Sequence, residues 1–117
     1  MSTETGYKGF KELNCWKEGR ILRISVSALT KQLPPTEKYE LTLQMTTAAR
    51  SVTANIAEGY GRFSYTDTRH FFVMARGSVT ELLDHLTVAI DEGYINAETA
   101  AGIENNAKVF LNLSMVI

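Results

Sequence analysis

The stretch LTLQMTTAARSVTANIAEGYGR, residues 41–62, decides the fold of this chain. One set of positions recurs at intervals of four and three residues, the heptad-like spacing of a helix that packs along one seam: Leu41, Met45, Ala48, Val52 and Asn55. Most side chains between residues 46 and 57 are small, so a second helix can approach closely. The sequence therefore predicts a helix over 36–58 whose several threonines make it depend on tertiary packing.

Apolar residues with helical spacing predict three more helices, over 10–32, 65–92 and 97–113. Pro34 and Pro35 separate the first helix from the second, because proline lacks the N–H that a helix ladder needs. The chain has no further proline and no strand-like alternation. Helix is therefore expected for most of its length.

Short polar connections join the predicted helices. Ser64, followed three residues later by an aspartate, resembles a capping box, and Asn96 is a candidate N-cap of the last helix. The sequence therefore predicts an all-α fold, an antiparallel up-down-up-down four-helix bundle over 10–117. A flexible N-terminal segment over 1–9 is expected to precede it.

The predicted helix over 65–92 carries two apolar stripes. One comprises Phe71, Ala75, Ser78, Leu82 and Ala89, and the other comprises Phe72, Val79, Leu83, Leu86 and Ile90. Two interpretations remain open. Both stripes face neighbours within one bundle, or part of the second stripe faces another subunit.

Composition limits the function classes. The chain has 117 residues, 21% of them charged, and a net charge of −1, whereas nucleic-acid-binding domains are usually strongly basic. Its one cysteine, Cys15, cannot form an internal disulfide, which favours a reducing compartment. No signal peptide and no apolar run of about 20 residues is visible, so a cytoplasmic protein without a membrane partner is expected.

No set of residues predicts catalysis. His70 and His85 are fifteen residues apart on one helix, too far to share a metal ion. Glu81, Asp84 and His85 are interpreted as a solvated helix face, because the carboxylates of a di-metal bundle are missing. The sequence therefore predicts a non-enzymatic protein with no catalytic, cofactor-binding or metal-binding residues.

The motif ANIAEGYGR, residues 54–62, ends the second predicted helix. Gly59 is expected to take the left-handed conformation that closes a helix. Asn55 lies on the predicted seam, where a buried amide usually pairs across an interface. Glu58 has three candidate partners, namely Arg62, Arg50 and a neighbouring subunit, and both Asn55 and Glu58 are interpreted as structural.

The predicted helix over 10–32 is basic. Lys17, Arg20, Arg23 and Lys31 form a candidate nucleic-acid-binding strip. A salt-dependent grip on nucleic acid requires several phosphates to be neutralised, and one subunit offers few cations for this. A ring of subunits would multiply the strip.

Several motifs resemble one known family. They are Leu13 with Trp16, LTKQLPPTEKYEL, SVTANIAEGYGR and ARGSVTEL, within residues 10–95. These motifs resemble the four-helix-bundle protein family, also called the 23S rRNA intervening-sequence protein family, which is termed ribosomal protein by historical accident. The resemblance implies a left-handed bundle that assembles into a homopentamer.

The same resemblance extends to the accessory variability protein of diversity-generating retroelements. It implies binding to a reverse transcriptase and to nucleic acid through a strongly basic surface, from which this chain departs with its net charge of −1. The residues that match the family motif are Asn55, Glu58, Gly59, Gly61, Arg62, Ala75, Gly77, Ser78 and Glu81. By resemblance, Glu58 and Arg62 link helices or subunits, and Gly77 and Ser78 allow close approach to the second helix.

These observations predict a non-enzymatic, oligomeric helical scaffold, a homopentamer, that binds a protein partner. The alternative is an RNA- or DNA-associated protein of the 23S rRNA intervening-sequence type that uses the basic strip.

Overall fold

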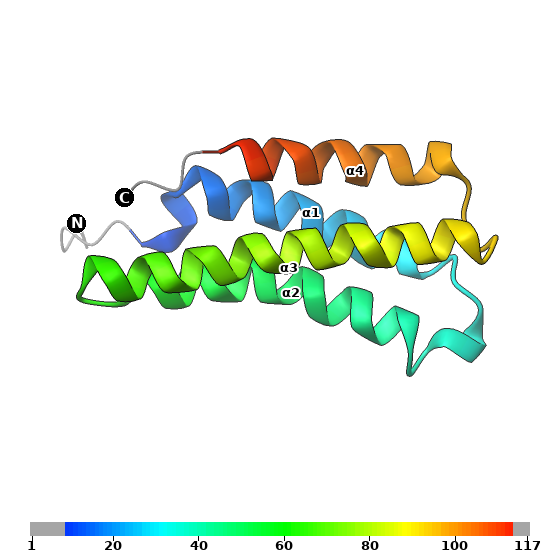
Figure 1. Cartoon of the computed structure of the whole chain (residues 1–117), viewed down its shortest axis with the longest axis horizontal. Helices are drawn as coiled ribbons and strands as arrows, with labels where there is room; N and C mark the ends of the chain where they lie inside the picture. The colour runs from blue at the N-terminus through cyan, green and yellow to red at the C-terminus, as the bar shows by residue number, and fades with distance from the viewer. Residues whose placement is uncertain (1–8, 114–117) are drawn as a thin grey trace, which may run out of the picture.

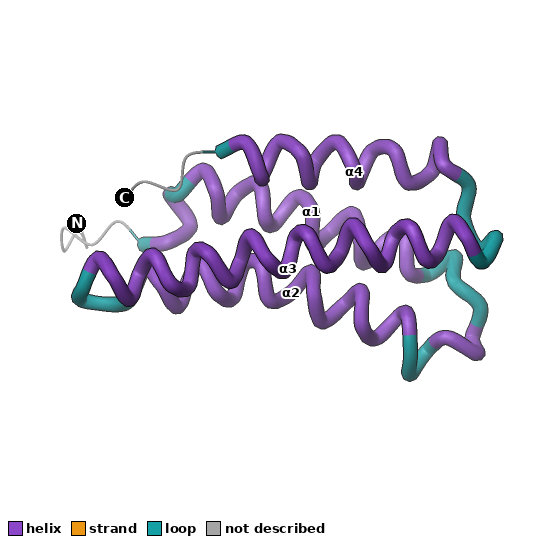
Figure 2. Tube along the Cα trace, in the orientation of Figure 1, coloured by secondary structure: helices purple, strands orange, loops and turns teal. Residues whose placement is uncertain are grey.

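The computed structural model describes residues 9–113, and within that range the chain forms helices and no strand (Figures 1 and 2). The elements are the 3-10 helix η1 (Phe10–Glu12), α1 (Asn14–Thr30), the 3-10 helix η2 (Pro35–Glu37), α2 (Leu41–Tyr60), α3 (Tyr65–Asp91) and α4 (Ala97–Asn112). The predicted all-α class with four helices is confirmed. Residues 1–8 of the predicted flexible segment and residues 114–117 of the predicted bundle lie outside the described residues.

The first two helices begin later than predicted. Leu13 is extended, with φ −72° and ψ 132°, so it separates η1 from α1. At the second helix, Pro34 is extended and Pro35 opens only the short η2. The chain makes a 3-10 turn there, in which the Glu37 N–H donates to the Pro34 carbonyl oxygen at 2.9 Å. It then enters α2 at Leu41, whose N–H donates to the Glu37 carboxylate at 3.2 Å.

The predicted caps are present. The Ser64 side chain accepts a hydrogen bond from the Asp67 N–H at 3.1 Å and begins α3. The Asn96 side chain accepts one from the Thr99 N–H at 2.7 Å and begins α4. Gly93, at φ +77°, makes the turn between these two helices in the left-handed region that favours glycine.

The buried face of α3 combines residues from both predicted stripes in one regular repeat. Its buried residues are Thr68, Phe72, Ala75, Val79, Leu82, Leu86 and Ala89, which alternate in steps of four and three. This seam takes members from both predicted stripes, and Phe71, Leu83 and Ile90 flank it as partly buried side chains. All ten residues of the two predicted stripes are buried or partly buried, and the contacts of α3 with α2 and α4 agree with the interpretation that both stripes face neighbours within one bundle.

Each helix contacts two neighbours around a four-sided arrangement. The most extensive backbone packing is between α2 and α3, followed by α1 with α2, and α4 contacts both α1 and α3. Within the described residues, neither the pair α1 and α3 nor the pair α2 and α4 comes into close backbone contact. The hydrophobic core therefore lies along the central axis of an elongated molecule measuring 50 × 34 × 25 Å (Figure 1).

The crossing of α2 and α3 is close at Gly59. An ideal Cβ on Gly59 would lie 2.9 Å from the Phe71 Cβ and 3.0 Å from the Thr68 carbonyl oxygen. Gly59 does not take the predicted left-handed conformation, because α2 continues through Tyr60. The absence of a side chain at this position allows the two helices to approach.

Two of the predicted contacts between α2 and α3 have different outcomes. The Ser51 hydroxyl donates to the Ser78 hydroxyl oxygen at 2.5 Å, so Ser78 does lie at the interface. Gly77 is exposed, and an added Cβ there would meet no atom within 4 Å, so its predicted role in close approach is wrong. Gly77 points away from the neighbour because it is one residue, or about 100°, from Ser78 on the helix.

Asn55 is not in the buried seam of α2. It is partly buried, and its Nδ2 donates to the Ser51 carbonyl oxygen of the same helix at 2.8 Å. The seam passes instead through Val52 and Ile56 to Gly59. The predicted seam position of Asn55 is therefore wrong, since the helix keeps its ordinary period of 3.6 residues near this end.

A hydrogen bond ties two connections together at one end of the molecule. The Tyr94 hydroxyl, between α3 and α4, donates to the Glu37 carboxylate at 2.6 Å. This bond to Glu37, with burial and the nearby carboxylates of Glu37, Glu92 and Glu40, raises the pKa of Tyr94 to about 12. The neutral phenol is therefore held in the folded state.

We expect Tyr94→Phe to remove the most alkaline step from the phenolate titration of the folded protein, followed by ultraviolet absorbance. An unfolded tyrosine has a pKa of about 10, so the stability that Tyr94 contributes is present below that pH and is lost as pH rises through the folded value of about 12. Tyr39→Phe is the control, because Tyr39 is exposed. Loss of the same alkaline step in Tyr39→Phe, with Tyr94→Phe unchanged, would contradict the assignment.

A candidate binding groove between α1 and α2

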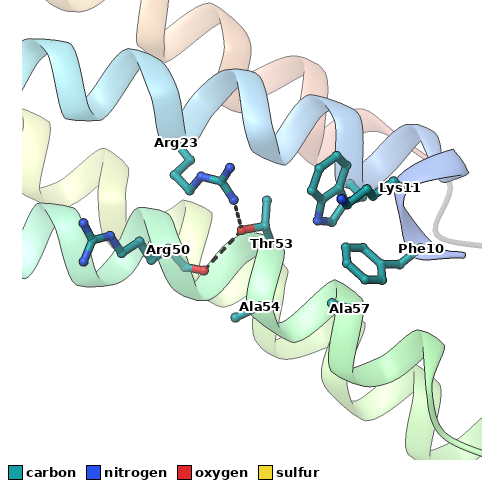
Figure 3. Close-up of a pocket in the computed structure, with 8 residues that line it drawn as sticks. Phe10, Lys11, Arg23, Arg50, Thr53, Ala54 and Ala57 are labelled. Carbon is teal, nitrogen blue, oxygen red and sulfur yellow. Dashed lines mark hydrogen bonds between the residues drawn. The ribbon is translucent and has the colours of Figure 1, made fainter.

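An open groove of about 460 Å³ runs between the first half of α1 and the second half of α2, and η1 closes one end (Figure 3). Eight residues line it: Phe10, Lys11, Trp16, Arg23, Arg50, Thr53, Ala54 and Ala57. Four of them are apolar and three are cationic. The arrangement therefore combines an apolar floor with a basic rim.

The aromatic end of the groove is fixed by local structure. The extended residue Leu13 turns η1 back so that the Phe10 ring meets the Trp16 ring edge to face, with centroids 5.4 Å apart. The Arg20 guanidinium lies over the Trp16 ring, 5.8 Å from its centroid. Trp16 is consequently only 8% exposed, whereas Phe10 remains partly exposed toward the groove.

Within the described residues, the cations of the groove have no anionic partner. Arg23 Nη1 donates to the Thr53 hydroxyl at 2.8 Å, and that hydroxyl donates to the Arg50 carbonyl oxygen at 3.4 Å (Figure 3). Over residues 9–113, no carboxylate makes an ion pair with Lys11, Arg23 or Arg50, and none lines the groove. The positive charge of the rim is therefore balanced only by solvent.

The four cations of the predicted basic strip do not share one surface. Lys17 and Arg20 are exposed on the outward face of α1, and Lys31 is exposed at its C-cap position. Arg23 is partly buried and turns toward α2, where it enters the groove. Three of the four predicted cations thus remain exposed.

The family-motif residues at the end of α2 interact within one subunit. Glu58 and Arg62 form an exposed ion pair at 3.1 Å, one of the three pairings considered from the sequence. The Arg62 guanidinium also lies 4.6 Å from the centroid of the Phe71 ring, which joins the end of α2 to α3. Gly61 is exposed and ends the helix at φ −80°.

Two other candidate chemical groups have ordinary surroundings. Glu81 lies 2.9 Å from the His85 ring on the same helix, and no group of three metal-binding side chains occurs in the part of the chain that the structure describes. Cys15 is buried, and burial raises the pKa of its thiol, which lowers its thiolate fraction at neutral pH.

Sequence reasoning missed most of the groove. Phe10, Lys11 and Thr53 were assigned no role, and Arg50 was considered only as a partner for Glu58. The available signal was the pair of small residues Gly19 and Thr53, because an ideal Cβ on Gly19 would lie 3.2 Å from the Thr53 methyl group. Where α1 and α2 cross this closely, the side chains about one helical turn from Gly19 and Thr53 line the two sides of one groove.

The fold and the groove define a small helical protein with a basic-rimmed surface site. The model of the family described as 23S rRNA-intervening sequence protein matches residues 11–113, and the chain belongs to this family. No curated protein sequence matches this chain. None of the helices within residues 9–113 combines the length and hydropathy needed to cross a bilayer.

A solved structure has a similar fold. It is a protein of unknown function from the S23 ribosomal protein family of Bacteroides thetaiotaomicron, with a TM-score of 0.76 and 20% sequence identity. The match covers 83% of this chain and 91% of that chain. At this identity the likeness concerns the fold alone.

Proposed function

We propose that this protein is a non-enzymatic cytoplasmic scaffold, a left-handed up-down-up-down four-helix bundle that assembles into a homopentamer and binds a protein partner. The four-sided contact pattern supports the topology, as does the reversal of chain direction at each connection in Figure 1. The buried free thiol of Cys15 is compatible with a reducing compartment.

Exposed aliphatic side chains carry the proposal of self-assembly. Ile21 and Ile24 lie on the outward face of α1, and Ile24 is 55% exposed. Val73 and Met74 are exposed on α3 in the same way. Packing between subunits would remove this apolar surface from water, which is the main source of stability in oligomer interfaces.

We expect the native protein to have a mass near five times 13.0 kDa in light scattering at micromolar concentration. The double variant Ile21→Glu, Ile24→Glu should lower the mass, because charged side chains resist burial between subunits. Lys108→Glu, at an exposed position of α4, is a control for the charge change. Its mass should equal that of the parent protein. A parent protein that sediments and scatters as a monomer would refute the assembly.

A second candidate function is association with RNA or DNA. The exposed cations Lys17, Arg20 and Lys31 favour it as an alternative to assembly through the same face of α1, because on a face left free by other subunits they would meet phosphates. We expect oligonucleotide binding that weakens steeply as the salt concentration rises. Replacing all three cations by glutamate should abolish this binding, and the control Lys108→Glu should leave it intact. Binding to oligonucleotides that survives the triple variant would exclude this surface.

A further inference from the structure

We infer that the groove between α1 and α2 binds an acidic peptide segment of a partner protein. An apolar side chain of the segment would lie on the floor made by Phe10, Ala54 and Ala57, and flanking carboxylates would meet the rim. The inference rests on the proposed function, because it assigns the site at which the scaffold holds its protein partner.

Charge complementarity is the first support. Lys11, Arg23 and Arg50 surround the groove without a carboxylate among its lining residues, although the whole chain carries a net charge of −1. The nearby acidic side chain Glu58 is engaged by Arg62. An approaching carboxylate therefore meets a local excess of positive charge.

The environment of Arg23 is the second support. Its guanidinium is partly removed from water and is held only by a neutral acceptor, the Thr53 hydroxyl at 2.8 Å. A guanidinium has five N–H donors in a planar fork, so donors remain for a carboxylate. A charge-assisted bond at a partly desolvated site is stronger than the same bond on an open surface.

The apolar floor favours a peptide over nucleic acid. Single-stranded nucleic acids are held by bases that stack on free aromatic faces. The Trp16 ring offers no such face, because Arg20 lies over it and Phe10 abuts it, which leaves it 8% exposed. The partly exposed Phe10 ring is then the one aromatic ring in the groove lining on which a base could stack. The methyl groups of Ala54 and Ala57 instead form a shallow channel suited to an aliphatic or phenyl side chain.

Two other surface grooves lack this combination. The groove between α1 and α4, lined by Ser25, Gln32, Thr99 and Asn106 among others, carries no charged side chain. The groove between α2 and α3 is lined by Glu37, Glu40, Asp84 and Glu92 and would repel an acidic segment. The basic groove is therefore the better match for an acidic partner.

The test uses the full-length protein and fluorescent synthetic peptides of defined sequence. One peptide places a phenylalanine or leucine between aspartates and glutamates, and a second replaces the acids by asparagine and glutamine. A single-stranded RNA of the same net charge is the third probe. We expect saturable binding of the acidic peptide, with binding of the amide peptide at least about tenfold weaker, because the rim loses its ionic partners.

Two variants locate the site. Arg50→Glu reverses a rim charge, and Ala54→Trp fills the floor. Both positions are exposed, so the fold should tolerate them. Each variant should weaken binding of the acidic peptide at least about tenfold. The matched controls Lys108→Glu and Ala101→Trp, at exposed positions of α4, should bind as the parent does. Thermal unfolding of all four variants verifies that they are folded.

Three results would overturn the inference. The first is no binding of the acidic peptide, and the second is acidic-peptide binding that neither Arg50→Glu nor Ala54→Trp weakens. The third is binding of RNA to the groove in place of the peptide. A photo-crosslinking amino acid at position 54, compared with one at position 101, distinguishes failure of the groove inference from failure of the proposed scaffold function. Crosslinks in the source cell to acidic peptides at position 54 support the groove. Crosslinks to protein that form at position 101 and not at position 54 would reject peptide binding in the groove but support a protein-binding scaffold. Crosslinks to nucleic acid alone would reject both the groove inference and the protein-binding function.

Discussion

Phe110→Ala is expected to lower the free energy of unfolding by about 3–5 kcal/mol. The Phe110 side chain is fully buried, and its ring reaches across from α4 to the crossing of α1 and α2, where its Cε2 lies 3.7 Å from an ideal Cβ on Gly19. Truncation therefore leaves a cavity between three helices in addition to the lost burial of the ring. This cavity cannot collapse easily, because Gly19 already brings α1 close to α2.

Denaturant unfolding at one fixed protomer concentration measures the effect, since any self-association makes apparent stability depend on concentration. Val109→Ala is the matched control. Val109 is the neighbouring residue and is 47% exposed, so its truncation should change the free energy by no more than about 0.5 kcal/mol. Equal losses in the two variants would show that the inward face of α4 is misassigned.

Gly59→Ala is expected to destabilise the protein by about 1 kcal/mol net, although alanine is the better helix former. The added Cβ would overlap the Phe71 Cβ at 2.9 Å and the Thr68 carbonyl oxygen at 3.0 Å, both of which belong to the stiff frame of α3. Overpacking of this kind costs about 1–3 kcal/mol, and the helix must shift to relieve it. The gain in helix propensity, up to about 1 kcal/mol, is smaller.

Gly77→Ala provides the opposite case in the neighbouring helix. Nothing lies within 4 Å of an added Cβ at Gly77, so the propensity gain should appear undiminished and raise the melting temperature. Thermal unfolding followed by circular dichroism compares both variants with the parent. A melting temperature that rises in both would mean that α2 and α3 are not in close contact at Gly59.

The local features of the fold could be predicted from sequence. Ser64, Asn96 and Gly93 act through neighbouring backbone groups, so their roles as caps and turn follow from residue type and position alone. The four helices follow from apolar spacing for the same reason. The start of α2 was less predictable, because the two prolines permit either an α-helical or a 3-10 first turn, and the bond from Leu41 to Glu37 selects the latter.

The contacts between helices could not be predicted in the same way. Gly59 on α2 and Gly77 on α3 are both glycines in adjacent helices, yet Gly59 lies against Phe71 and Gly77 faces solvent. The difference is set by the rotation of each helix, which one residue changes by about 100°. Arg23 was likewise grouped with Lys17 in one strip, whereas the structure turns it inward to Thr53. The groove could not be predicted because the rotations of α1 and α2 about their axes determine which side chains line it.

The order of the four helices along the chain, with α4 after the other three, has a consequence for synthesis. Among the helices within residues 9–113, α4 contacts α1 and α3, and α2 already contacts α1 and α3 without it, so α1, α2 and α3 can pair in sequence order as the nascent chain emerges. Contacts between consecutive helices are close in sequence and form quickly. The central axis stays open to water along one side until α4 has left the exit tunnel. A chain halted before residue 97 therefore exposes its apolar interior and becomes a target for chaperones and proteases.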